Sequence, residues 1–200
     1  MKRPLFETIW KRGLLVVSAV LFALLLGEGI CRLLFARVDY LKPTLLTHEV
    51  LGYIIEPGSA GHDAWGYRNP LVPERAELVA IGDSQTYGVA ASAHDAWPAQ
   101  LQRLTGRRVY NLSLGGYGPV QYLYLLEHRA LALSPSTVVV GFYFGNDLMD
   151  AWSMVYGHAS WARLRRSEWA GADHPWPASP GGGGGEPADW LHGGLREDRK

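Results

Sequence analysis

The sequence predicts an α/β domain built on a parallel sheet and preceded by one membrane-spanning helix. Apolar runs with strand character occupy residues 77–81, 108–112 and 137–144, and a segment with helical character lies between each pair. This alternation indicates parallel strands joined by right-handed crossovers. An uncharged aliphatic run near the N-terminus indicates the membrane helix. Because only three strands are found, we expect the sheet to be incomplete.

The composition is that of one domain with a substantial core. The chain has 200 residues, of which 48% are hydrophobic, and it contains 8 Trp and 10 Tyr. Its formal net charge is zero and its Lys and Arg are scattered, so nothing favours a nucleic-acid partner. Cys31 is the single cysteine, which excludes an internal disulfide and a cysteine-based zinc site. No metal or cofactor is indicated, and neither is an oligomeric state.

Residues 13–35 are predicted to form a transmembrane helix, after a basic segment at residues 1–12. A bilayer core requires about 20 apolar residues. That length is reached only if Glu28 and Arg32 are tolerated, and their spacing of four places them on one helix face, where they can pair. The main alternative is a cleaved signal peptide, but no small-x-small cleavage site follows the run. We therefore expect an uncleaved anchor.

The basic residues before the span predict its orientation. By the positive-inside rule, the N-terminus lies in the cytoplasm and the rest of the chain lies outside, which makes this a single-pass protein of the cytoplasmic membrane. Residues 36–76 are predicted to be a connector and loop, with one short strand at 53–55. Arg68 lies in this part, and we expect it to form an ion pair or to bind an anion.

The segments between the strands have recognisable helix ends. Residues 95–105 are predicted to form a helix that Gly106 ends. Pro119 can occupy the first turn of the next helix, whose apolar face ends before Pro135. The third strand, 137–144, is continuously apolar and β-branched, so we expect it to be buried on both faces.

Polar or glycine-rich segments follow all three strands, at residues 82–84, 111–118 and 145–147. Because the carboxyl ends of parallel strands lie at one edge of a sheet, these segments are expected to meet there. They contain a serine hydroxyl, backbone N–H groups at a glycine turn, and the neutral amide of an asparagine. A nucleophile with two further donors for a developing oxyanion is a set that acyl transfer requires.

These three segments resemble the first three conserved blocks of the SGNH/GDSL hydrolase family, across residues 77–150. The resemblance implies a three-layer α/β/α, flavodoxin-like fold. It also implies Ser84 as the nucleophile and, through its own N–H, the first oxyanion donor. Gly116 and Asn146 are implied as the other two donors. The anchor together with these blocks resembles the membrane-anchored bacterial members in particular.

The match to the family pattern leaves some positions open. Gln85 stands where the family usually has leucine. Gly115 or Gly118 could be the backbone donor in place of Gly116. Asn146 could instead cap a helix.

A serine nucleophile needs a base, which the resemblance implies is the histidine of an Asp-x-x-His block. Asp189 and His192 have this spacing, but residues 151–200 are predicted to form an irregular tail rich in Trp, Pro and Gly. That tail lacks the strand that separates the third block from the last one in the family. Either the chain is truncated before its real base, or the tail returns and places His192 beside Ser84. We favour truncation.

The function implied by the resemblance is that of a serine esterase or acyl-transfer enzyme with an acyl-Ser84 intermediate and no cofactor. The implied substrate is an O-acetylated envelope glycan or a lipid ester. The alternative is a catalytically inactive, membrane-anchored protein with a binding role in envelope glycan assembly.

Overall fold

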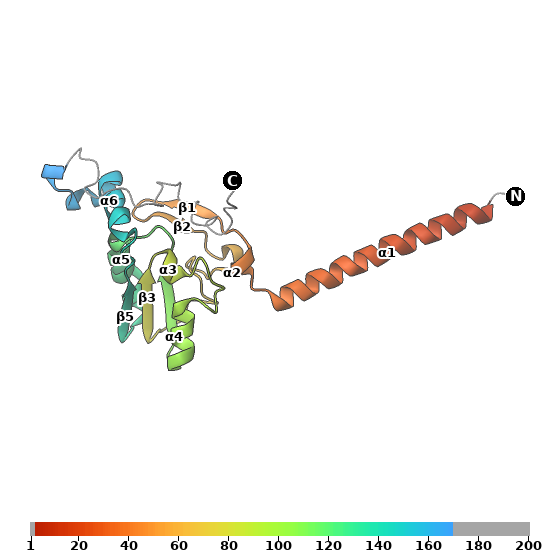
Figure 1. Cartoon of the computed structure of the whole chain (residues 1–200), viewed down its shortest axis with the longest axis horizontal. Helices are drawn as coiled ribbons and strands as arrows, with labels where there is room; N and C mark the ends of the chain where they lie inside the picture. Colours follow the sequence, from red (N-terminus) through yellow and green to blue (C-terminus); the bar gives the residue numbers. More distant parts are fainter. Residues whose placement is uncertain (1–2, 170–200) are drawn as a thin grey trace, which may run out of the picture.

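The computed structural model describes residues 3–169, which form a long N-terminal helix and a mixed α/β domain (Figure 1). Helix α1, Arg3–Leu34, extends away from the domain and is exposed along its described length. Its part Ile9–Leu34 is long and apolar enough to cross a membrane. The expected pair on this helix is present, since Arg32 Nε lies 2.6 Å from Glu28 Oε1.

The centre of the domain is a three-stranded parallel sheet with the order β4-β3-β5. Strand β3, Leu78–Gly82, pairs on one side with β4, Val109–Ser113, and on the other with β5, Thr137–Gly141. The short helix α3, Ser84–Tyr87, follows β3 directly. The parallel arrangement predicted from the alternating pattern is therefore confirmed.

Two crossover helices connect the strands, and their ends follow local chemistry. Helix α4, Trp97–Thr105, ends at Gly106, which has the positive φ of 69° that glycine adopts easily. Helix α5, Pro119–Leu125, begins at its proline as expected and continues as a π-helical turn, Leu126–Ala130, and a 3₁₀ turn, Leu131–Leu133.

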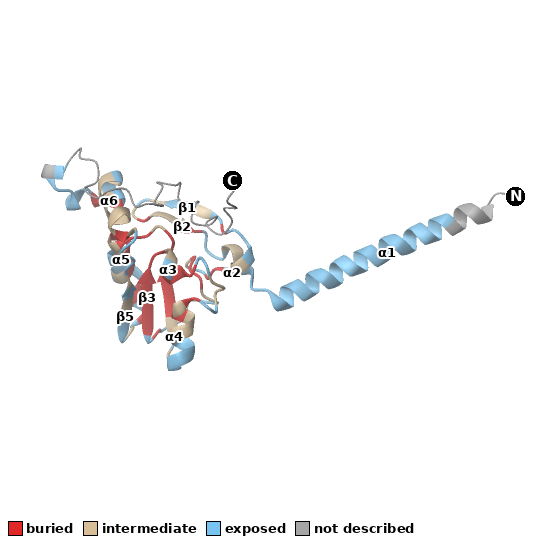
Figure 2. Cartoon of the chain, viewed as in Figure 1, coloured by how far each residue is buried: buried red, intermediate tan, exposed pale blue. Residues whose placement is uncertain are grey.

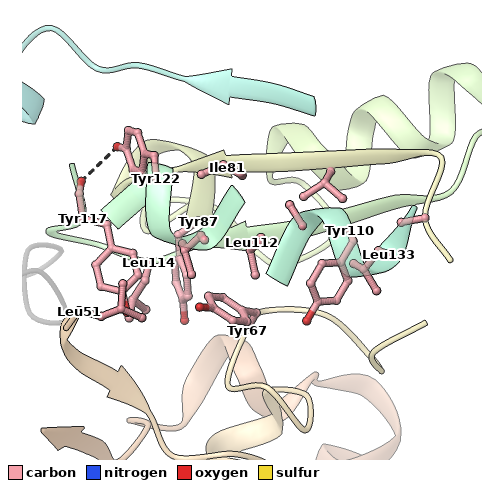
Figure 3. Packing of buried hydrophobic residues seen from close by; sticks show 14 of the residues in the cluster. Leu51, Tyr67, Ile81, Tyr87, Tyr110, Leu112, Leu114, Tyr117, Tyr122 and Leu133 are labelled. Carbon is pink, nitrogen blue, oxygen red and sulfur yellow. Dashed lines mark hydrogen bonds between the residues drawn. The ribbon is translucent and has the colours of Figure 1, made fainter. Parts of the chain in front are cut away.

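The main hydrophobic core lies on one face of the sheet and is rich in tyrosine (Figures 2 and 3). Every residue of β3 is buried, as expected for the central strand. Around it pack the rings of Tyr67, Tyr110 and Tyr117 with the side chain of Leu112. Buried tyrosine hydroxyls need hydrogen-bond partners. Tyr122, for example, donates to the carbonyl oxygen of Tyr117 at 3.1 Å.

The expectation that the third strand is buried on both faces is wrong. β5 lies at an edge of the sheet and ends at Gly141, and Val140 is 51% exposed. The apolar run continues outside the sheet, where Phe144 is 81% exposed. An apolar β-branched run shows that a segment favours extended backbone, but burial also requires a neighbouring strand or layer.

A β-hairpin packs over the loop that follows β4. Its strands are β1, Leu45–His48, and β2, Gly52–Ile55, paired antiparallel. The short strand predicted at 53–55 is confirmed, whereas β1 was not predicted. Tyr53 and Tyr117 join the hairpin to that loop, because the Tyr117 hydroxyl donates to the Tyr53 carbonyl oxygen at 2.6 Å.

Residues 151–157 are helical, which corrects the expectation of an irregular tail from residue 151. Helix α6 spans Asp147–Gly157, and 3₁₀ turns follow at Ala159–Leu164 and Ser167–Trp169. The first turn of α6 carries two acidic residues, which interact favourably with the positive end of the helix dipole. Trp161 is buried and donates from Nε1 to the carbonyl oxygen of Val50 at 2.8 Å.

A buried ion pair fixes the connector after α1 to the domain. Helix α2, Arg37–Tyr40, carries Asp39, whose Oδ1 lies 2.6 Å from Arg68 Nη2. The same oxygen accepts the backbone N–H of Ala93 at 2.7 Å. Of the two roles expected for Arg68, the structure therefore has the ion pair.

Candidate functional site

The candidate site is built at the edge of the sheet where all three strands end. Gly82, the last residue of β3, is in register with Ser113 of β4 and with Gly141 of β5. The three polar segments therefore leave the sheet from neighbouring positions, as the sequence predicts.

Ser84 begins α3 directly after the central strand and is half-buried. Asp83 is the N-cap of this helix, and its Oδ1 accepts the N–H of Gln85 at 2.9 Å. Ser84 Oγ donates to the other oxygen of Asp83 at 3.3 Å.

One close packing contact and several hydrogen bonds determine the path of the chain around Ser84. A Cβ on Gly82 would lie 2.0 Å from Thr86 Oγ1, so α3 can fold back against the strand end only where glycine stands. At the other end of α3, Tyr87 contacts His62, with 2.8 Å between its hydroxyl and His62 Nε2. Arg68 donates from Nη1 to the carbonyl oxygens of Tyr87 and Gly88 at 3.1 and 2.5 Å. The serine is therefore presented by a turn anchored at both ends.

Gly116 lies in the loop after β4 and is also half-buried. Its φ is +73°, and a Cβ there would lie 2.5 Å from the hydroxyl of Tyr53. That hydroxyl donates to the carbonyl oxygen of Gly115. The conformation and the close approach of β2 both favour glycine, which accords with a backbone N–H donor in a tight turn.

Gly118 brings this loop against the start of α6. A Cβ on Gly118 would lie 3.0 Å from the carbonyl oxygen of Asp147 and 3.1 Å from the backbone nitrogen of Ala151. The glycine-rich loop and the segment after β5 are thus in direct backbone contact.

Asn146 directly precedes α6, at the N-cap position. This is the position expected for the alternative role of helix cap, but its side chain makes no capping hydrogen bond. Its Nδ2 donates to Asp150 Oδ2 at 2.6 Å, and its Oδ1 is buried without a hydrogen-bond partner in the described chain. An amide nitrogen carries two hydrogens. One is held by Asp150, which leaves the second as a donor.

Three carboxyl groups gather around these strand ends. Burial raises the pKa of Asp83, of Asp147 to about 6 and of Asp150 to about 7. For Asp147, burial outweighs the hydrogen bonds from the Tyr143 N–H, at 2.9 Å, and the Tyr122 hydroxyl, at 3.0 Å. Repulsion from Asp147 and then Asp83 adds to the effect of burial on Asp150. Near pH 7 the cluster therefore carries less negative charge than three free carboxylates would.

A cavity of about 400 Å³ adjoins the glycine loop, between the hairpin and α6. Its lining combines apolar side chains with hydrogen-bonding groups, and includes Leu45, Tyr53, Gly116, Asp150, Met154 and His158. This volume lies within the range of about 300–1,000 Å³ for small-molecule pockets.

The structure brings Ser84, Gly116 and Asn146 to one edge of the sheet, whereas Asp189 and His192 lie outside the described residues. Sequence reasoning missed the contacts of Tyr53 with the glycine loop and of Asp150 with Asn146. The Asp150 contact has a local signal, since residues four apart share a helix face. The contact of Tyr53 with Gly115 has no local signal in the sequence, because the two residues are 62 positions apart.

Comparison of the chain with protein-family models, with curated proteins and with solved structures found no match.

Proposed function

We propose that this protein is a serine esterase or acyl-transfer enzyme of the SGNH/GDSL type, acting on ester or O-acetyl groups. The observation that carries the proposal is the register of the sheet, which places the segments bearing Ser84, Gly116 and Asn146 at one edge. The half-buried state of all three residues is compatible with access for a small acyl group. The same proposal includes the three-layer, flavodoxin-like fold that the resemblance implies.

In this mechanism the Ser84 oxygen attacks the ester carbonyl carbon while a base removes the hydroxyl proton. The oxygen that becomes negative accepts hydrogen bonds from the N–H groups of Ser84 and Gly116 and from Asn146 Nδ2. Collapse of this intermediate expels the alcohol and leaves an acyl-Ser84, which water or an acceptor hydroxyl then attacks. The residue of this chain that would supply the base is His192, oriented by Asp189.

The test is covalent labelling by a fluorophosphonate together with hydrolysis of a short acyl ester. We expect labelling and turnover by the full chain and neither by Ser84→Ala. Ser136→Ala is the matched control, because Ser136 lies beside the start of β5, at the opposite end of the sheet. Folded protein that shows neither labelling nor turnover would overturn the proposal.

One observation favours the alternative of a non-catalytic, anchored binding protein. Within residues 3–169, the hydrogen-bond partner of Ser84 Oγ is Asp83, and no histidine is hydrogen-bonded to it. The alternative predicts that His192→Ala changes neither labelling nor turnover, whereas a base at His192 predicts loss of turnover.

The location proposed with this function is the outer side of a cytoplasmic membrane, with the N-terminus inside. The basic residues before the apolar helix support it. Reporter fusions to the C-terminus test it: a phosphatase that is active only outside the cytoplasm should be active, and a fluorescent protein that matures only inside should be dark.

A further inference from the structure

A second cavity, of about 920 Å³, is lined in part by the connector that joins α1 to the domain. Its lining comes from the connector at residues 36–38, from the loop 68–74, from α4 and from β4. It does not include Ser84, Gly116 or Asn146. The site at the strand ends therefore does not account for this cavity.

The connector brings the cavity close to the membrane surface if α1 spans a bilayer. The 26 residues of Ile9–Leu34 span about 39 Å at the helical rise of 1.5 Å per residue. This exceeds the hydrocarbon core of about 30 Å and nearly equals the full bilayer of about 40–45 Å. The end of α1 thus lies in the head-group layer, and the connector lies at its surface.

The packing of the connector prevents the cavity from moving far from that surface. Asp39 is held by Arg68 and by the N–H of Ala93. A Cβ on Gly61 would lie 2.9 Å from the backbone nitrogen of Val38, so the connector is packed directly on the loop before the sheet. The residues that line one wall of the cavity also link the domain to the membrane helix.

The lining combines an apolar surface with basic groups and one carboxylate, that of Glu74. The apolar lining residues are Leu71, which is 63% exposed, Val109, prolines and alanines, and the basic side chains include Arg37 and Arg108. In the described part of the chain, neither of these arginines has a carboxylate within ion-pair distance. Arginine guanidinium groups recognise phosphate through paired hydrogen bonds.

We propose that this cavity binds the head group of an anionic membrane phospholipid from the leaflet that faces the domain. The phosphate would lie against a basic side chain of the wall, Arg37 or Arg108, and the adjoining carbons of the lipid would lie against the apolar residues of the lining, such as Leu71. A phospholipid suits the cavity because it carries an anionic group next to an apolar chain. It also lies at the membrane surface, where the connector holds the cavity. Such binding would fix the orientation of the domain on the membrane.

The test uses the full chain in a zwitterionic detergent and titrates it with dihexanoyl phosphatidylglycerol, a soluble anionic lipid, by isothermal calorimetry. We expect saturable binding that Arg37→Gln or Arg108→Gln weakens about fivefold, the contribution typical of one basic residue facing an anionic lipid. Arg103→Gln is the matched control, because Arg103 is exposed on the neighbouring helix α4 and does not line the cavity. Its affinity should equal that of the unaltered chain.

Two further titrations measure separately how much the negative charge and the apolar carbons of the lipid contribute to binding. Dihexanoyl phosphatidylcholine should bind at least fivefold more weakly, because its head group carries no net charge. Inorganic phosphate should compete only at far higher concentration, because it lacks the apolar carbons. Equal affinity for the two lipids, equal competition by phosphate, or unchanged affinity in both arginine variants would overturn the proposal. The outcome is independent of esterase activity, since none of the altered residues lies at the strand ends.

Discussion

Replacement of Arg68 by methionine is expected to destabilise the domain by about 3–5 kcal/mol, the usual cost of removing one partner of a buried ion pair. The Arg68 and Asp39 side chains are 5% and 11% exposed. Methionine retains the apolar stem but removes every donor of the guanidinium. The carboxylate of Asp39 loses its charged partner, and three backbone carbonyl oxygens lose a donor, those of Tyr87, Gly88 and Ala91.

These contacts explain the size of the effect. A buried acceptor left without a donor costs about 1–3 kcal/mol, so the three carbonyls and the carboxylate would together exceed the proposed range if their costs added. They do not add fully, because Asp39 keeps the N–H of Ala93 and water can enter the space that the guanidinium leaves. Against a typical domain stability of about 5–15 kcal/mol, the loss would remain large.

The measurement is equilibrium unfolding of the full chain in urea, followed by tryptophan fluorescence, with the Asp39→Ala and double variants completing a cycle. We expect a coupling of about 0.5–3 kcal/mol between the two positions. Arg107→Met is the control, since its ion pair with Glu77 is long, 3.8 Å, and more exposed, so its cost should stay below about 1 kcal/mol. An Arg68→Met cost below that value, or an absence of coupling, would show that the ion pair does not hold the connector to the domain.

Three further predictions concern the strand ends. Gly82→Ala should cost about 1–3 kcal/mol by urea unfolding, because its Cβ would lie 2.0 Å from Thr86 Oγ1, whereas Gly157→Ala, with nothing within 4 Å, should not destabilise the protein. Because burial raises the pKa of Asp147 from 3.8 to about 6, the folded state binds more protons than the unfolded state between these values. The free energy of unfolding should therefore fall as the pH rises through this window, and Asp147→Asn should reduce the slope; an unchanged slope would contradict the reasoning. If Asn146 is an oxyanion donor, Asp150→Ala should lower kcat about tenfold with little change in KM, and an unchanged kcat would show that Asp150 does not position the amide.

Local patterns predicted most of the regular structure correctly. Glycine at 106 and proline at 119 mark a helix end and a helix start in the structure as in the sequence. The three strands are found because each is a short apolar run bounded by turn residues, and their parallel order follows from the crossovers between them. The register then predicts which polar segments meet.

The errors arise where a pattern has more than one tertiary outcome. The run 137–144 is apolar whether or not another layer covers it, so its sequence could not show that β5 is an exposed edge that ends at Gly141. The helix from Asp147 was missed because tryptophans and glycines farther along the tail outweighed its own short apolar face.

The sequence by itself therefore determined the apolar helix, the three strands of the parallel sheet and the three polar segments, because each depends on residues that are neighbours along the chain. Only the tertiary structure decided that Tyr53 packs on the glycine loop, that Arg68 pairs with Asp39, and that the connector forms one wall of a cavity. The Arg68–Asp39 pair joins residues 29 positions apart and the Tyr53 contact joins residues 62 positions apart. Such partners are selected by the shape of the folded domain rather than by any local periodicity.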